Sequence, residues 1–251
     1  MEQFIGIIPA RYASTRFPAK PLAVIAGKLM IQRVYERASA ILEHVVVASD
    51  DVRIIDAVKD FGGKAVMTSE KHRSGTDRCA EALGTIVGMT GINFSVVINI
   101  QGDEPFIRSE QIDTIKKCFD DRDTQIATLI KRIDNSSIIF DPNKPKVIID
   151  RHGFALYFSR SPIPYLRDFE KDVWHKKHNF FQHIGMYAYR TNVLHEIAHL
   201  LPGELEKAES LEQLRWLENG YRIKAAITEF ESFGIDTPED LKKAISMGLV
   251  D

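Results

Sequence analysis

Short segments rich in β-branched residues alternate with longer amphipathic segments along most of the chain. This alternation is typical of βαβ units and predicts an α/β fold with a mixed, largely parallel central sheet. The predicted strands are Ile5–Ile8, Val45–Ala48, Ala65–Met67, Val96–Ile100, Ile126–Ile130, Val147–Ile149, Ala155–Phe158, Gly185–Tyr189 and Ile223–Ile227. The predicted helices are Met30–Leu42, Asp51–Phe61, Thr76–Val87, Ser109–Phe119, Val193–Leu200, Leu205–Asn219 and Pro238–Met247.

The pattern becomes strand-rich and less regular after Thr124, where prolines also accumulate. No flexible linker separates this part from the rest, so we expect a single domain over residues 1–251 with a strand-rich insertion at about 125–190. Within the insertion, the polar segment Trp174–His178 has no metal-ligand spacing and is predicted to be an exposed loop.

The charge balance narrows the class of partner. The 251 residues include 33 Lys and Arg against 35 Asp and Glu, a formal net charge of −2. General nucleic-acid binding needs clustered positive charge, so no nucleic-acid partner is expected. No segment is apolar over the length of a membrane span, and no leader pattern opens the chain, so we expect no membrane partner and a cytoplasmic location. The cysteines, Cys79 and Cys118, lack redox or zinc spacing and are predicted to be buried thiols.

The first loop, residues 9–22, concentrates candidate phosphate ligands. Ligands of an open parallel sheet bind beyond the carboxyl ends of its strands, which selects the loops after Ile8, Ala48, Met67 and Ile100. The first of these loops contains the cations Arg11, Arg16 and Lys20, and the small residues Ala10, Ala13, Ser14 and Ala19 allow close approach of backbone amides. It is neither a Walker loop nor a dinucleotide-binding glycine pattern. A solvated basic loop is the alternative.

Two acidic segments are candidate magnesium sites. Asp103 follows the predicted strand Val96–Ile100 in a turn that Gly102 permits, and its hard oxygens suit magnesium. A carboxylate there could instead cap the helix that begins near Ser109. Asp236 is the second candidate ligand, although Asp236 or Thr237 could equally cap the helix that begins at Pro238.

The polar segment His72–Arg78 leads into a helix. Ser74 and Thr76 can cap that helix, and its first amides could form an anion or base-edge site. The structural and the functional interpretation both stay open for this segment. Paired acids and several cations at one sheet edge favour nucleotidyl transfer, in which a metal bridges triphosphate oxygens and cations offset the charge on pyrophosphate.

Two other classes of function compete with that hypothesis. The segment His195–His199 fits H-E-x-x-H, the zinc protease pattern, on a predicted helix. Pro202 stands where the extended zinc motif needs glycine, which weakens this alternative. A regulatory nucleotide-binding module is the other alternative, and turnover of a nucleoside triphosphate would exclude it.

Seven sequence runs resemble one enzyme family. The runs IIPARYASTRFPAKPL, HRSGTDR, NIQGDEP, ALYFSRSPIP, QHIGMYAYR, LEQLR and IDTPEDL, in this order from Ile7 to Leu241, resemble the 3-deoxy-manno-octulosonate (Kdo) cytidylyltransferases, or CMP-Kdo synthetases. The resemblance implies a Rossmann-like nucleotidyltransferase fold, usually a homodimer, that uses magnesium. It implies transfer of CMP from CTP to Kdo, with release of pyrophosphate, for the lipopolysaccharide inner core. A related sugar acid, amino-Kdo or sialic acid, stays open as the acceptor.

The resemblance also implies roles for individual residues. Arg16, Lys20, Asp103 and Asp236 would carry catalysis, with Asp103 and Asp236 as the magnesium ligands. The residues implied to bind CTP are Ala10, Arg11, Ser14, Arg16, Lys20, Ser74, Gly75, Arg78 and Gln101. The residues implied to bind the sugar acid are Gln101, Arg160, His183, Tyr189, Glu209 and Gln213.

The sequence departs from the family pattern at two positions. Ala19 stands where the family usually has glycine, and Leu29 stands where proline usually follows Gly27 and Lys28. Ala19 fits without strain only if its φ is negative. Leu29 concerns the start of a helix.

Overall fold

The computed structural model describes residues 2–13 and 17–247. The chain divides into two compact units. Unit 1 combines Met1–Asp113, Ala188–Ala198 and Ser232–Asp251, and unit 2 combines Thr114–Tyr187 and His199–Glu231. The insertion expected at 125–190 overlaps unit 2, which begins earlier and also includes a later part of the chain.

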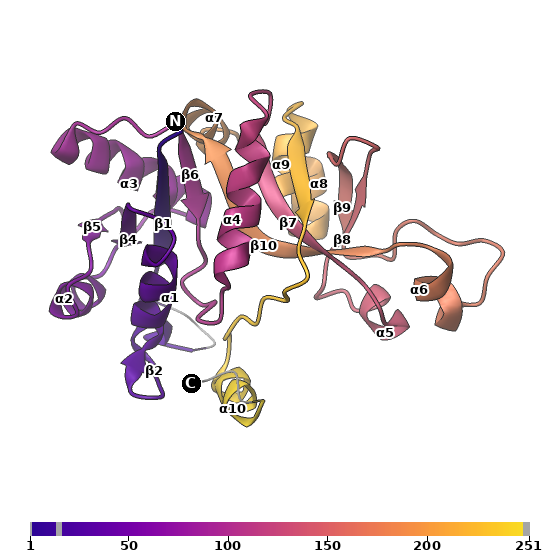
Figure 1. Cartoon of the computed structure of the whole chain (residues 1–251), viewed down its shortest axis with the longest axis horizontal. Helices are drawn as coiled ribbons and strands as arrows, with labels where there is room; N and C mark the ends of the chain where they lie inside the picture. Colours follow the sequence, from indigo (N-terminus) through magenta and orange to yellow (C-terminus); the bar gives the residue numbers. More distant parts are fainter. Residues whose placement is uncertain (1, 14–16, 248–251) are drawn as a thin grey trace. The chain divides into compact units, whose positions relative to one another are not determined.

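Unit 1 is built on four parallel strands in the order β6-β1-β4-β5 (Figure 1). The strands are β1 (Phe4–Ala10), β4 (Val45–Ser49), β5 (Ala65–Met67) and β6 (Val96–Asn99). β4 and β6 are buried along their whole length, as expected of β-branched strands with helices on both faces. The helices that pack on these strands are α1 (Met30–Ser39), α2 (Val52–Asp60) and α3 (Gly75–Thr90).

A short hairpin and the C-terminal segment form a small apolar cluster in unit 1. The hairpin joins β2 (Val24–Ile25) to β3 (Lys28–Leu29) through Ala26 and Gly27, both with positive φ. Two positive φ angles in a two-residue loop are the geometry of a type I′ turn. Ile25 of the hairpin packs with residues of α1 and of α10 (Pro238–Ser246), which holds the C-terminal segment in unit 1.

Unit 2 contains strands of both directions. β7 (Ile126–Arg132) pairs in parallel with β11 (Ile223–Ile227). β8 (Lys146–Ile149) pairs antiparallel with β9 (Ala155–Ser159) and with β10 (Phe181–Arg190), whose last residues belong to unit 1. Between β6 and β11 the chain forms the helices α4 (Ser109–Lys117), η2 (Cys118–Asp120), α5 (Ser136–Ile139), η3 (Lys171–Val173), α6 (Trp174–Lys177), α7 (Thr191–Ala198), α8 (Glu204–Glu209) and α9 (Gln213–Glu218). Of these, α7 belongs to unit 1, and α4 begins in unit 1.

The predicted fold class is confirmed. β1 pairs in parallel with β4 and β6, β4 with β5, and β7 with β11, whereas β8 pairs antiparallel with β9 and β10, so the sheet is mixed. Cys79 and Cys118 are buried free thiols, as predicted. In the described part of the chain, no helix has the length and apolar character that crossing a bilayer requires.

Two local predictions are wrong. The helix expected over Leu205–Asn219 is two helices, α8 and α9, because Ser210 takes a left-handed conformation with φ 51° and ends α8. The segment Trp174–His178 is not a loop, because residues Trp174–Lys177 form α6. Lys176, Lys177 and His178 are exposed as expected, but the Trp174 side chain is 1% exposed. Trp174 packs with Ile133, Ile139 and Phe180 in an apolar cluster of unit 2, which a local polar pattern cannot reveal.

Candidate functional site

A cavity of about 520 Å³ opens in unit 1 at the carboxyl ends of its strands. Ligand pockets commonly have this size and lie at this position in open parallel sheets. Its walls come from the loop after β1, the start of α3, the loop after β6 and the segment before α10. The predicted site residues that line it are Ala10, Arg11, Lys20, Ser74, Gly75, Arg78, Gln101, Asp103 and Asp236. The predicted residues Ser14 and Arg16 lie outside the described residues.

Lys20 joins the two acids predicted to ligate magnesium. Its Nζ donates to Asp103 Oδ2 at 2.6 Å and to Asp236 Oδ1 at 3.0 Å. Burial alone would lower the Lys20 pKa, but the two carboxylates outweigh that effect, so the pKa is raised and the ammonium stays charged. Two carboxylates thus converge on one cation. The same hard oxygens fit a divalent cation with its other positions open to water or phosphate.

A backbone contact brings the two acids together. The amide of Ile235 donates to the carbonyl oxygen of Asp103 at 2.9 Å, which places Asp236 beside Asp103 although they are far apart in sequence. Thr237 caps α10, since its Oγ1 accepts from the amide of Asp240 at 3.2 Å. The Asp236 carboxylate is therefore not needed for capping, and Asp236 lines the cavity.

The turn after β6 is shaped by close backbone approach. A Cβ on Gly102 would lie 2.7 Å from the carbonyl oxygen of Pro9 at the end of β1, so this position accepts only glycine without a shift. The next acid, Glu104, accepts from Ser232 Oγ at 2.9 Å. Enclosure of this carboxyl group and the neighbouring Asp103 charge raise its pKa to about 7, against the smaller effect of Ser232.

The loop after β1 is closed by its own backbone. The amide of Ala19 donates to the carbonyl oxygen of Tyr12 at 3.0 Å, and the Arg53 guanidinium lies 3.3 Å from the centre of the Tyr12 ring. Ala19 has φ 56°, in the left-handed region that favours glycine. The departure from the family pattern at Ala19 therefore puts local strain beside Lys20.

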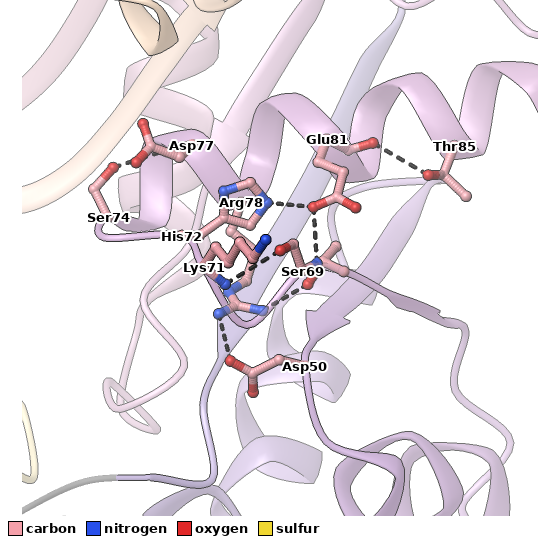
Figure 2. Close-up of polar contacts among 10 residues, drawn as sticks. Asp50, Ser69, Lys71, His72, Ser74, Asp77, Arg78, Glu81 and Thr85 are labelled. Atoms are coloured by element: carbon pink, nitrogen blue, oxygen red, sulfur yellow. Dashed lines mark hydrogen bonds and ion pairs between the residues drawn. The ribbon is translucent and has the colours of Figure 1, made fainter. Parts of the chain in front are cut away.

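Side-chain hydrogen bonds hold the first turn of α3 at its start, through Ser74, and at its end, through Arg78 (Figure 2). Ser74 is its N-cap, because Ser74 Oγ accepts from the amide of Asp77 at 3.1 Å. One turn later, Arg78 donates to Asp50 Oδ2 at 2.7 Å and to Thr68 Oγ1 at 2.6 Å. Asp50 and Thr68 were not among the predicted site residues. Both directly follow strands, β4 and β5, and the loops after these strands are among those predicted from the sequence to bind ligands.

Arg160 and Glu209, both predicted to bind the sugar acid, lie together in unit 2. Glu209 accepts from Ser159 Oγ at 2.6 Å and from the amide of Arg160 at 2.9 Å. The Arg160 guanidinium donates to three backbone carbonyl oxygens, those of Glu209, Pro142 and Ser210. In this arrangement Arg160 fastens the end of β9 to the end of α8 and to the segment before β8.

Gln213 is buried and His183 is half-buried, both in unit 2. The Thr128 hydroxyl donates to the carbonyl oxygen of Met186 at 2.8 Å, so its oxygen is left to accept from His183 Nε2 at 2.9 Å. Burial of the ring lowers the His183 pKa to about 3, which keeps it neutral. Gln213 is 4% exposed, and its Nε2 has no hydrogen-bond partner among the described residues.

The remaining predicted sugar ligands belong to unit 1. The Tyr189 side chain is fully buried, with its hydroxyl 3.4 Å from Thr76 Oγ1. Gln101 lines the cavity, and its Nε2 donates weakly to Asn99 Oδ1 at 3.4 Å.

The zinc alternative is not supported by the structure. α7 ends at Ala198, so the second histidine of the H-E-x-x-H pattern, His199, lies beyond the helix that should present both. Across residues 2–13 and 17–247, no three His, Cys, Asp or Glu side chains gather as a metal-binding group.

Comparisons with known proteins agree with the architecture of this site. A family model described as "Cytidylyltransferase" matches residues 5–225. A protein from Parabacteroides distasonis named 3-deoxy-manno-octulosonate cytidylyltransferase is 60% identical over 250 residues, 98% of each chain. One of the same name from Phocaeicola vulgatus is 58% identical over 245 residues, 96% of each chain. A solved CMP:2-keto-3-deoxy-manno-octonic acid synthetase, in complex with CTP, superposes with a TM-score of 0.89 at 41% identity over 98% of both chains.

Proposed function

Because this chain belongs to the family of 3-deoxy-manno-octulosonate cytidylyltransferases, we propose that it transfers CMP from CTP to Kdo and releases pyrophosphate. The product, CMP-Kdo, would serve synthesis of the lipopolysaccharide inner core. The observation that carries the proposal is the unit 1 cavity, where Lys20, Asp103 and Asp236 converge among the residues expected to hold CTP.

Nucleotidyl transfer asks the protein mainly for positioning and charge. The anomeric hydroxyl oxygen of Kdo would bond to the α-phosphorus of CTP while the bond from that phosphorus to the bridging oxygen of pyrophosphate breaks. The hydroxyl proton leaves to water, and no covalent enzyme intermediate forms. Lys20 and Arg11, both at the cavity, would bind the triphosphate and offset the charge that develops on pyrophosphate, and Arg16 is proposed to share this role.

The residues of the cavity also support a role for magnesium. Asp103 and Asp236 would hold the ion, because their carboxylates already converge on the position of one cationic group. Bound there, magnesium supplies Lewis-acid polarisation of phosphate oxygens. Lys20 would then exchange a carboxylate partner for a phosphate oxygen, since its ammonium can donate three hydrogen bonds and binds phosphate as a point charge.

The acceptor sugar is proposed to use Gln101, Arg160, His183, Tyr189, Glu209 and Gln213. Gln213 offers a buried Nε2 that has no hydrogen-bond partner in residues 2–13 and 17–247, which is the state expected of a group that awaits a ligand. A homodimer in the cytoplasm is the proposed assembly and location, and sedimentation velocity of the purified chain checks the dimer.

Pyrophosphate release from CTP and magnesium, with and without Kdo, tests the proposed function. We expect Kdo-dependent release that falls by about 100-fold or more in Asp103→Asn and Asp236→Asn, because each loses one anionic oxygen donor. Asp56→Asn, which neutralises an exposed carboxylate of α2, is the matched control and should behave as wild type. Release with sialic acid or amino-Kdo but not with Kdo would change the substrate, and no release with any of them would reject the function.

A further inference from the structure

Arg78 is a deeply buried cation at the wall of the cavity. Its side chain is 1% exposed, yet it lines the cavity together with Ser74 and Gly75 of the same helix start. A buried guanidinium is costly unless a negative charge and hydrogen-bond acceptors compensate it. Asp50, which is 15% exposed, supplies the charge (Figure 2). Thr68 supplies a second acceptor.

The two acceptors leave part of the guanidinium unused. Asp50 accepts from Nη2 and Thr68 accepts from Nη1, whereas a guanidinium carries five N–H donors in a rigid plane. Within the described residues, no protein acceptor takes the other N–H groups of Arg78. With two donors fixed on the strand ends, the plane of the guanidinium is also fixed, and so is the direction in which the remaining donors point.

Among the described residues, the Asp50 carboxylate has no hydrogen-bond partner other than Arg78. Its neighbour Asp51 caps α2, since Asp51 Oδ1 accepts from the amide of Arg53 at 2.9 Å. Ser49 Oγ accepts from the amide of Asp51 at 3.2 Å, so the turn after β4 is also stabilised without Asp50. The Asp50 carboxylate is therefore committed to Arg78.

From this geometry we propose that Asp50 is a positioning residue for nucleotide binding, with Thr68 as its partner. The pair holds the Arg78 guanidinium so that its free N–H donors face the cavity and bind acceptor atoms of CTP. Asp50 also neutralises Arg78, so these donors select hydrogen-bond acceptors of the nucleoside rather than any anion. The inference rests on the proposed function only in taking CTP as the ligand.

Calorimetric titration of the full chain with CTP, joined to steady-state kinetics, tests the role of Asp50. In Asp50→Ala we expect the Kd and KM for CTP to rise by about 10-fold, the effect of one misplaced charge-assisted hydrogen bond. We expect kcat and the KM for the sugar to change by less than about threefold, because Asp50 does not touch the reacting atoms. Asp51→Ala is the matched control: it removes the adjacent carboxylate and should leave the Kd for CTP unchanged.

A double-mutant cycle separates positioning from general destabilisation. If Asp50 acts through Arg78, Asp50→Ala should raise the Kd by less than about twofold in an Arg78→Ala background. An additive rise there would overturn the proposal, as would a wild-type Kd in folded Asp50→Ala. Should Asp50→Ala fail to fold, Thr68→Val decides the matter: it should raise the Kd by about threefold or more, and Thr68→Ser should restore it. A wild-type Kd in Thr68→Val would then reject the inference.

The same titration keeps the two proposals apart. No binding of CTP by the wild type would overturn the proposed function and this inference with it. Binding by the wild type that is unchanged in Asp50→Ala overturns the inference alone, since the identity of the acceptor sugar plays no part in the titration.

Discussion

Two of the arginines predicted to bind substrates, Arg78 in unit 1 and Arg160 in unit 2, use their guanidinium groups in opposite ways. Arg78 lines the cavity and donates to the side chains of Asp50 and Thr68, which follow strands. Its other N–H groups are left for a ligand under our proposal. Arg160 donates to three backbone carbonyl oxygens and so fastens separate segments of unit 2. The comparison shows that a motif places an arginine near a site, while the neighbouring acceptors decide whether its donors are left for a ligand.

The same contrast holds for the acids. In unit 1, Asp103 and Asp236 share one ammonium, a partner that a divalent cation can replace. In unit 2, both oxygens of Glu209 accept from the protein itself, at the end of β9. Variants of unit 1 should therefore change nucleotide chemistry, and variants of unit 2 should change stability and sugar binding together.

Replacing Lys20 should give the largest effect. In Lys20→Met the ammonium is lost while the aliphatic chain is kept, so kcat/KM for CTP should fall by about 100- to 1000-fold, as when a preorganised group that stabilises a transition state is removed. Pyrophosphate release measures it. Lys28→Met removes an ammonium that donates to Glu36 at the surface of unit 1 and should retain wild-type kinetics. Equal losses in both variants would mean that the effect is not specific to the cavity.

Replacing Glu209 should have the next largest effect and tests the unit 2 side of the comparison. Glu209→Gln keeps one acceptor oxygen for the Arg160 amide but removes the negative charge that strengthens the hydrogen bonds from Ser159 and Arg160. We expect a loss of about 1.5–3 kcal/mol in the free energy of unfolding. The KM for the sugar should rise while the Kd for CTP stays constant. Urea denaturation and kinetics of Glu204→Gln, on the exposed face of the same helix, provide the control.

The half-buried His183 should make the stability of unit 2 depend on pH. Its pKa is about 3 in the fold, below the ordinary value of 6.5, so the unfolded chain binds a proton that the folded chain does not between these values. Stability from this residue is therefore present above pH 6.5 and is lost as the pH falls toward 3, at up to about 1.4 kcal/mol per pH unit. Chemical denaturation from pH 7 to pH 4 measures this slope. His183→Gln should flatten the profile, and His152→Gln, at an exposed position, should not.

Sequence alone predicted those features that depend on local pattern or on strand order. Ser74 and Thr237 cap helices as expected, because capping involves residues within one turn. Lys20 and Asp103 meet because the carboxyl ends of neighbouring parallel strands share one edge. The partners of Arg160 could not be predicted, since its carbonyl acceptors come from separate loops. Asp50 lies in none of the sequence motifs, and its hydrogen bond with Arg78 depends on the packing of α3 on the strands.

The smallest expected effect concerns Ala19, next to Lys20. At φ 56° an alanine pays about 1–2 kcal/mol that glycine does not, while glycine loses about 0.5–1 kcal/mol more conformational entropy on folding. Ala19→Gly should therefore raise the free energy of unfolding by up to about 1 kcal/mol. Ala23→Gly is the matched control: Ala23 has φ −62°, so glycine there should destabilise by about 0.5–1 kcal/mol. Thermal or urea unfolding should show these opposite signs, and destabilisation by both changes would mean that Ala19 is not strained.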